Sequence, residues 1–199
     1  VLPEPIDLDI VYEDHDIIVI NKPKGMVVHP APGHYSGTLV NALLYHCKDL
    51  SGINGVMRPG IVHRIDKDTT GLIVACKNDY AHNFIANQLA EHSITRTYHA
   101  ITNGRLADNS GVVDKALGRD PFYRKKIAVV PNGKRAVTHY SVINNYRNDK
   151  FNENYSYIKC NLETGRTHQI RVHMASLKHP LLGDTVYGPQ KCHYKTDGQ

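Results

Sequence analysis

The segment "HRIDKDTTG", residues 63–71, gathers side chains that could do acid–base or nucleophilic chemistry. The carboxylic acid of Asp66 follows a histidine and an arginine, and a lysine, a second acid and a Thr-Thr-Gly turn come after it. The apolar run "GLIVACK" (71–77) begins at once and is typical of a buried strand. Asp66 therefore lies in a loop that enters a sheet, where it is either an ordinary surface residue or a single catalytic acid with cationic neighbours.

Other catalytic chemistries lack their sequence patterns. His168 and His173 are five residues apart, whereas a helical zinc pair needs a spacing of four, so we expect no metal site. The absence of GxSxG, P-loop and GxGxxG patterns leaves nucleophilic-serine, nucleotide and dinucleotide chemistry without support and predicts no cofactor. Asp66 and Asp68 could share one side of an extended segment, as a hydrolase built on two acids needs. Asp68, however, is better interpreted as a turn or capping residue among its threonine neighbours.

The charge balance favours a polyanionic partner. Lys and Arg together number 24 and Asp and Glu 19, which gives a net charge of +5 and a pI near 9.0. The clusters "YRKK" (123–126) and "GKR" (133–135) lie in a stretch punctuated by Gly and Pro, as loops do. Lys125 and Lys126 are therefore candidate substrate-binding residues, and a merely solvated surface is the alternative.

The composition also bears on where the protein works. The 199 residues contain no apolar run long enough to span a membrane, and no secretory pattern opens the chain. The four cysteines form no CxxC pair, which favours reduced thiols. These features predict a cytoplasmic protein with no membrane partner. Because the first residue is Val1 rather than Met, we expect the sequence to be a fragment.

Hydrophobic periodicity predicts an α+β fold with a largely antiparallel mixed sheet, in one domain covering residues 1–199. Strands are expected in five apolar or alternating segments: 17–20, 71–77, 94–102, 135–143 and 155–162. Helices are expected after Thr38, from Asn78 or Asp79, and from Thr167 to Leu177. One face of the strand 155–162 is expected to hold Ser156, Ile158, Cys160 and Leu162. The helix from Asn78 or Asp79 is expected to have an apolar stripe of Ala81, Phe84, Ile85 and Leu89, and the helix from Thr167 one of Ile170, Met174 and Leu177.

Four blocks of this sequence resemble one known family. "HRIDKDTTGLIV" fits the pattern H-R-[LI]-D-x-x-[TS]-[ST]-G-[LI] of the RluA-type RNA pseudouridine synthases. Three further blocks agree in order: "NKPKGMVVHP" (21–30), "TRTYHAITNG" (95–104) and "ETGRTHQIRVHMASLKHPLLGDTVYG" (163–188). The Lys-Asp after the acid looks most like the RluD-type branch, which modifies large-subunit ribosomal RNA.

The resemblance implies an enzyme that isomerises uridine to pseudouridine in RNA without a cofactor. It assigns the covalent or proton-transfer step at the ribose to Asp66, and an active-site role to Tyr98. Arg171 is implied as the cation that keeps the Asp66 carboxylate ionised in a dry pocket. The residues alone leave other roles open, because Tyr98 could pack across strands and Arg171 could pair with Glu163 or Asp184.

RNA binding is implied for residues around these three. Arg64 resembles the family's base-flipping arginine, which braces the gap left by an extruded base. His63 and Arg166 are further candidate substrate-binding residues. Family members usually continue beyond the "YG" of 187–188, and many carry an S4-type RNA-binding domain before the catalytic one. We therefore expect a catalytic fragment that acts as a monomer, and a non-catalytic RNA-binding or ribosome-assembly module is the alternative function.

Overall fold

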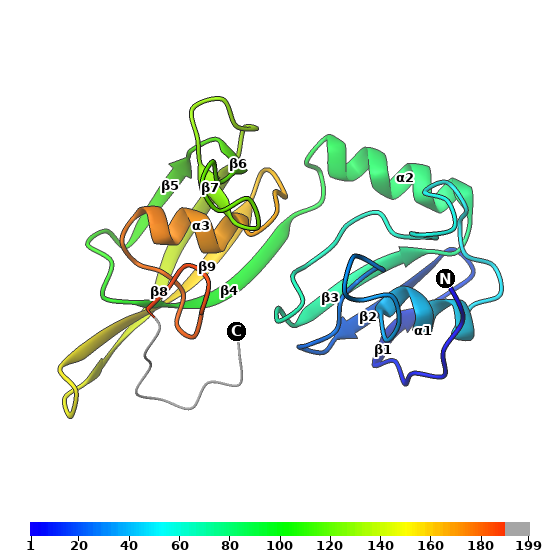
Figure 1. The fold of residues 1–199 in the computed structure, drawn as a ribbon, viewed down its shortest axis with the longest axis horizontal. Helices are drawn as coiled ribbons and strands as arrows, with labels where there is room; N and C mark the ends of the chain where they lie inside the picture. The colour runs from blue at the N-terminus through cyan, green and yellow to red at the C-terminus, as the bar shows by residue number, and fades with distance from the viewer. Residues whose placement is uncertain (190–199) are drawn as a thin grey trace. The chain divides into compact units, whose positions relative to one another are not determined.

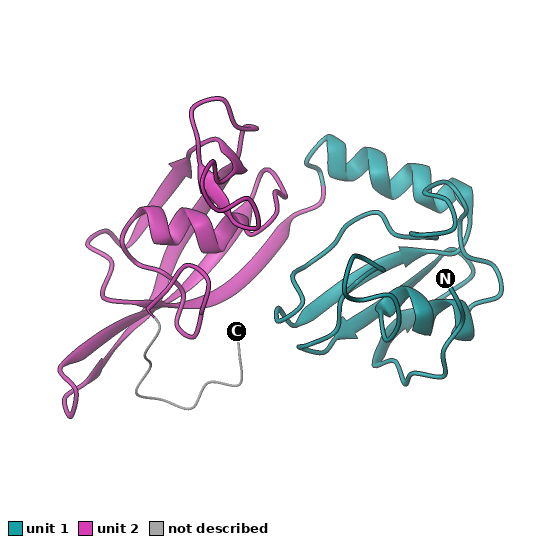
Figure 2. Cartoon of the chain, viewed as in Figure 1, with its two compact units in different colours: residues 1–93 teal, residues 94–199 magenta. Residues whose placement is uncertain are grey.

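The computed structural model describes residues 1–189 and divides the chain into two compact units, residues 1–93 and 94–199 (Figure 2). Unit 1 holds three strands, β1 (Ile10–Glu13), β2 (Ile17–Lys22) and β3 (Gly71–Cys76), and two helices, α1 (Leu39–His46) and α2 (Asp79–Ala90) (Figure 1). The three strands form one antiparallel sheet in the order β1-β2-β3. The loop that carries Asp66 leads directly into β3.

The core of unit 1 comes from one face of this sheet and from helix α1. Ile18 and Ile20 of β2 are paired in register with Ala75 and Ile73 of β3, and all four are fully buried. Helix α1 adds a set of fully buried apolar side chains: Leu39, Val40, Ala42 and Leu43. The sequence fixes where α1 starts, because Thr38 and Asn41 form a capping box across its first turn.

The described part of unit 2, residues 94–189, holds six strands and one helix, which are in chain order β4 (Arg96–Asn103), β5 (Ser110–Asp114), β6 (Leu117–Arg119), β7 (Ile127–Val129), β8 (Val137–Asn148), β9 (Glu153–Leu162) and α3 (Gln169–Ser176). Four of the strands form an antiparallel sheet in the order β4-β9-β8-β5, and β6 and β7 form a separate hairpin. All strand pairs within residues 1–189 are antiparallel, so the described strands make three sheets rather than the one that the sequence predicted.

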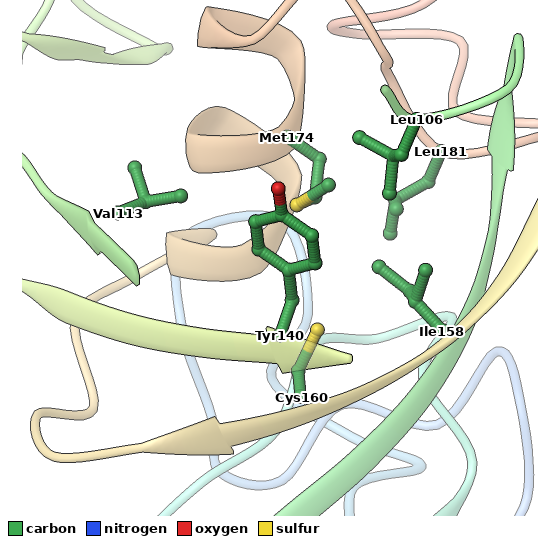
Figure 3. Close-up of a cluster of buried hydrophobic side chains, with 7 residues drawn as sticks. All are labelled: Leu106, Val113, Tyr140, Ile158, Cys160, Met174 and Leu181. Carbon is green, nitrogen blue, oxygen red and sulfur yellow. The ribbon is translucent and has the colours of Figure 1, made fainter. Parts of the chain in front are cut away.

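Helix α3 packs against the four-stranded sheet and closes the core of unit 2. Met174 of α3 and Tyr140 of β8 lie against each other beside Ile158 and Cys160 of β9 (Figure 3). Ile170 and Leu177 of the same helix pack against this cluster, as their spacing predicted. Arg171 is therefore carried on a helix whose orientation is fixed by apolar contacts.

Several expectations can now be compared with the structure. The buried strand face is confirmed for Ser156, Ile158 and Cys160, each fully buried, whereas Leu162 is half-buried. The helix expected from Thr167 begins two residues later, at Gln169, because His168 adopts a left-handed backbone conformation with φ of 54°.

The apolar stripe predicted for α2 is wrong in part. Phe84 is 52% exposed and stacks on Tyr80 with ring centroids 6.3 Å apart, while His82 is buried beside Ala81. The helix thus buries Ala81 as predicted, half-buries Ile85 and Leu89, and buries His82 while Phe84 stays exposed. No helix within residues 1–189 combines the length and the hydropathy of a membrane span. Cys192 lies outside the described residues, and the expectation of a single domain stays a prediction.

Candidate active site

The Asp66 segment, residues 63–70, is an irregular loop that leads into β3. Its side chains alternate between the protein interior and the surface: Ile65 is buried, Asp66 is half-buried and Arg64 is exposed. The backbone carbonyl of Asp66 accepts a hydrogen bond of 3.2 Å from the N–H of Thr69, which closes a tight turn directly after the acid. The turn places the carboxylate at a defined point of unit 1.

A buried lysine is hydrogen-bonded to the backbone of this loop. Lys22, the last residue of β2, is fully buried, and its ammonium group donates to the carbonyl oxygens of Pro23 (2.8 Å), Met26 (2.9 Å) and Lys67 (2.9 Å). The same Lys67 carbonyl also accepts a hydrogen bond from the N–H of Gly25 at 2.9 Å. Lys22 therefore ties the loop of residues 23–26 to the residue that follows Asp66.

The pKa of Lys22 reflects this position. Burial lowers the pKa of the ammonium group to about 8, and the negative charges of Asp68 and Asp66 oppose that change. The three carbonyl acceptors satisfy the three donors of the charged form, which is the usual condition for burying an ammonium group. The charge of Lys22 is thus within electrostatic reach of the candidate catalytic acid.

Sequence reasoning did not single out Lys22, although a signal was present. Side chains of a strand alternate between two faces, and Ile18, Ile20 and Lys22 fall on the same face of β2. A lysine that continues a core-facing series at the end of a strand needs buried acceptors. Its position two residues after buried Ile20 could have marked it as a supporting residue of the site.

Two histidines also bear on this loop, one through a hydrogen bond and one through its buried position near Arg64. The Nε2 atom of His63 accepts a hydrogen bond of 3.0 Å from the backbone N–H of Val74, which attaches the start of the loop to β3. His29 is 4% exposed, and its pKa is lowered to about 4 by burial and, to a smaller extent, by the positive charges of Arg58 and Arg64. His29 is therefore neutral near pH 7 and adds no repulsion to the cationic side chains around it.

In unit 2, Arg171 is held by a buried carboxylate. Its Nε and Nη2 atoms donate to the two carboxylate oxygens of Asp184 at 2.7 and 3.1 Å, a two-pronged contact. The Asp184 side chain is 1% exposed and that of Arg171 is 14% exposed. This ion pair is one of the alternatives that the sequence left open for Arg171.

The environment of Asp184 favours its ionised form. Burial by itself raises the pKa of this carboxyl group, but the hydrogen bonds from Arg171 and from the backbone N–H groups of Tyr187 and Val186 outweigh burial and lower the pKa below its ordinary value. The ring of Tyr187 also lies under the guanidinium of Arg171, with the carbon atom 5.0 Å from the ring centroid. Arg171 is thus fixed from two sides.

The remaining predicted site residues of unit 2 lie on different elements. Tyr98 of β4 is half-buried and packs against the hydrophobic cluster under α3, so the packing role that the sequence allowed is present. Arg166 is exposed and donates from Nε to the carbonyl of Arg135 at 3.0 Å. Lys125 is exposed, whereas the ammonium group of Lys126 donates to the carbonyl of Val186 at 3.1 Å.

The structure thus brings five of the predicted residues together in two groups. His63, Arg64 and Asp66 come together on one loop of unit 1. In unit 2, Lys126 and Arg171 both contact the segment 184–187. The expected ion pair between Asp66 and Arg171 would join the two units, and it stays a prediction.

One group of potential metal ligands occurs among the described residues. Glu13, His46 and Cys47 bring one ligand atom each within 4.8 Å of one another. Glu13 already pairs with Lys77 at 3.1 Å and with His46 at 2.8 Å, and burial raises the pKa of the Cys47 thiol to about 11. Glu13 of β1 and His46 of α1 thus form an ion-pair network with Lys77, the residue after β3. The expectation of a protein without a metal site stays a prediction.

Comparison with known proteins identifies the class to which this fold and this acid-bearing loop belong. A family model described as RNA pseudouridylate synthase matches residues 16–176, which includes parts of both units. The chain belongs to this family. The resemblance carried by the four sequence blocks is therefore confirmed.

Individual relatives agree with the branch that the sequence indicated. The chain is 57% identical over 192 residues to a protein of Zymomonas mobilis named ribosomal large subunit pseudouridine synthase D, covering 95% of this chain and 58% of that one. It is 56% identical over 191 residues to the RNA pseudouridine synthase YlyB of Bacillus subtilis, covering 96% of this chain and 61% of that one. The chain thus spans about three-fifths of the length of these relatives.

A solved structure confirms the fold class. Human RNA pseudouridylate synthase domain containing 1 is 25% identical to this chain and superposes with a TM-score of 0.74, covering 92% of this chain and 70% of that one. The α+β fold that the sequence predicted is therefore confirmed.

The anchoring role of Lys22 can be tested by hydrogen exchange. Lys22→Met should remove the ammonium donor from the carbonyls of Pro23, Met26 and Lys67, of which that of Lys67 keeps the N–H of Gly25. An unsatisfied buried group costs about 1–3 kcal/mol. We expect the amides of Gly25 and Thr69 to exchange roughly 5- to 150-fold faster than in the wild type. Lys24→Met, a change of an exposed lysine in the same loop, is the control and should leave both amides unchanged. Unchanged exchange in Lys22→Met would refute the anchoring role.

The Asp184–Arg171 pair should be visible in the pH dependence of stability. Asp184→Asn leaves a largely buried guanidinium without its counter-charge, so we expect the free energy of unfolding near neutral pH to fall by about 3–5 kcal/mol. The folded pKa of Asp184 is lowered, so its stabilisation is complete above the unfolded value of roughly 3.9 and is lost as pH falls through the folded value. The difference between wild type and variant in urea unfolding should therefore shrink at acidic pH.

A surface pair provides the control for this measurement. Asp149 pairs with Arg147, but its side chain is 88% exposed, so Asp149→Asn should leave the unfolding midpoint nearly unchanged. A pH-independent difference for Asp184→Asn would show that packing, rather than the charge, is responsible.

Proposed function

We propose that this chain is the catalytic part of an enzyme that converts specific uridines of RNA to pseudouridine, with large-subunit ribosomal RNA as the substrate. The observation that carries the proposal is the family match across residues 16–176 together with Asp66 on a loop anchored by buried Lys22. Relatives named ribosomal large subunit pseudouridine synthase D support the choice of RNA. The enzyme acts in the cytoplasm as a monomer, with RNA as its partner and no membrane or cofactor.

The proposed reaction needs few groups from the protein. The bond between N1 of uracil and C1′ of the ribose breaks, the base turns, and a new bond forms between C1′ and C5. The C5 proton moves to solvent or to a nearby base, and N1, which kept the electron pair of the broken bond, takes up one proton, so the product is an isomer of uridine. Atoms and electrons balance without an oxidant, a reductant or a group donor. A carboxylate is needed either to attack C1′ or to remove a ribose proton, and we assign that step to Asp66.

Tyr98 and Arg171 are the other proposed catalytic residues. The ring of Tyr98 can stack on uracil, and its hydroxyl group can assist the transfer of the C5 proton. Arg171 would supply positive charge to the Asp66 carboxylate. Because Arg171 already makes a bidentate contact with Asp184, this role requires the guanidinium to contact the Asp66 carboxylate in addition to that of Asp184.

Arg64 is proposed to hold the RNA while the base is extruded. It is exposed and two residues before Asp66, on the same anchored loop. A planar cation can stack in the space that a flipped base leaves and contact the adjacent phosphates. His63, Arg166, Lys125 and Lys126 are proposed to contribute substrate contacts around it.

The catalytic role of Asp66 can be tested with in-vitro-transcribed large-subunit ribosomal RNA and chemical mapping of pseudouridine. Asp66→Asn should lower turnover by about 10²–10⁴-fold. RNA binding should persist, because affinity comes mainly from phosphate contacts. Asp68→Asn, at an exposed acid of the same turn, should retain near-wild-type turnover.

The reaction should need no added metal or nucleotide, and it should survive excess EDTA on a short hairpin that folds without Mg²⁺.

Two outcomes of this experiment count against the proposal. Turnover of Asp66→Asn within about tenfold of wild type would remove Asp66 from the chemistry. RNA binding by the wild type without any pseudouridine would favour the alternative, a non-catalytic RNA-binding or ribosome-assembly module.

Arg64 is tested by comparing two substrates. Extrusion of a uridine costs a few kcal/mol in a duplex and little in a flexible single strand. Arg64→Ala should therefore slow the reaction on a structured hairpin far more than on an unstructured oligonucleotide with the same target sequence. Arg58→Ala, at another exposed arginine of unit 1, serves as the control for a general loss of positive charge. Equal losses on both substrates would indicate packing or direct chemistry instead of extrusion.

A further inference from the structure

The connection between β6 and β7 exposes two neighbouring aromatic rings. Phe122 is 88% exposed and Tyr123 is 66% exposed in the loop of residues 120–126, which we call the aromatic loop. A single exposed apolar residue needs no explanation, but two adjacent rings at the end of a hairpin form a surface that water solvates poorly.

The aromatic loop is held in one conformation by its own hydrogen bonds. The carboxylate of Asp120 accepts from the backbone N–H groups of Phe122 at 2.8 Å and Tyr123 at 2.9 Å. Arg119 donates to the carbonyl of Arg124 at 2.9 Å. The N–H of Asp120 is bonded to the carbonyl of Lys126 at 3.0 Å. The two rings are therefore presented by a preorganised turn, which lowers the entropy lost when a ligand binds.

The charge around the rings is positive. Arg119, Arg124, Lys125 and Lys126 belong to the loop or to the strand end before it, and the ammonium group of Lys126 lies 5.5 Å from the centroid of the Tyr123 ring. The one acid of the loop, Asp120, is occupied by backbone N–H groups. Aromatic faces surrounded by cations complement the exposed faces of unpaired bases on a phosphate backbone, so the charge selects a nucleic acid over an apolar protein surface.

The aromatic loop is connected to the candidate site within unit 2. Lys126 donates to the carbonyl of Val186 at 3.1 Å, and the N–H of Ile127 donates to the hydroxyl of Tyr187 at 3.0 Å. The ring of that same Tyr187 lies under the guanidinium of Arg171. The loop and Arg171 are thus attached to one short segment, and their positions relative to each other are fixed.

We propose that Phe122 and Tyr123 form a stacking platform for unpaired nucleotides of the RNA substrate. This inference rests on the proposed function, which identifies the ligand as RNA. It adds the requirement that the RNA near the target uridine be single-stranded where it contacts the aromatic loop. Bases in a duplex are stacked on one another and hide their faces, whereas unpaired bases can lie on aromatic rings. The platform would therefore select loops and bulges over continuous helices.

The experiment measures RNA binding without turnover. The Asp66→Asn protein is titrated with a short fluorescent oligouridylate and, separately, with a blunt RNA duplex of the same length. Phe122→Ala and Tyr123→Ala are compared with Phe122→Leu, which keeps an apolar side chain but has no aromatic face. Phe84→Ala, a change of a 52% exposed aromatic residue on α2, is the matched control.

We expect each alanine variant to bind the single strand roughly 5- to 150-fold more weakly, the range for loss of one base–aromatic stack. Phe122→Leu should lose affinity to a similar extent, and Phe84→Ala should lose none. Binding of the duplex should not change. The slope of log affinity against log salt should stay constant in the aromatic variants, whereas Lys125→Ala should reduce it by about 0.7.

Three results would overturn the platform: unchanged single-strand affinity, equal losses on single strand and duplex, or full affinity in Phe122→Leu. Unchanged RNA affinity would leave a protein partner as the explanation for the exposed rings. Because these variants are tested for binding alone, their outcome is separate from that of the proposed activity. If the wild type makes no pseudouridine and the alanine variants still lose single-strand binding, the proposed function fails and the platform stands.

Discussion

The buried ammonium group of Lys22 is the interaction on which the geometry of unit 1 depends. Removing a charge from water is unfavourable by several kcal/mol unless all its donors find partners, and here three carbonyls supply them. Those carbonyls belong to two loops that are far apart in the sequence, so a single side chain brings both together. The residue after Asp66 is one of the three acceptors. The candidate catalytic acid therefore has its position set by the requirement that a buried charge be fully hydrogen-bonded.

In unit 2 the buried charge that must be hydrogen-bonded is negative rather than positive. Asp184 is a buried anion that is satisfied by Arg171 and by two backbone N–H groups. An arginine with a flexible side chain thereby becomes a fixed cation, and Tyr187 restricts it further from the other side. In both units a buried ionised group holds an element of the candidate site through hydrogen bonds. Such supporting residues keep a site preorganised, which a loop of exposed residues alone could not do.

The two units also differ in how they present positive charge. In unit 1 the exposed Arg64 sits beside the candidate acid on an anchored loop, while buried His29 stays neutral. In unit 2 the cations gather around a hairpin whose tip carries exposed aromatic rings. This distribution suits a long polyanion that touches several loops at once.

The sequence by itself determined the local features of this protein. The capping box at Thr38, the buried face of β9 around Ile158 and the loop-to-strand transition after Asp66 follow from short-range patterns, because capping and alternation depend on neighbours in the chain. The family was also evident from four short blocks of sequence. Only the tertiary structure showed that Lys22 is buried under the Asp66 loop and that Arg171 pairs with Asp184. Those contacts join residues separated by many positions, and no periodicity in the sequence encodes which distant carbonyl or carboxylate satisfies a buried charge.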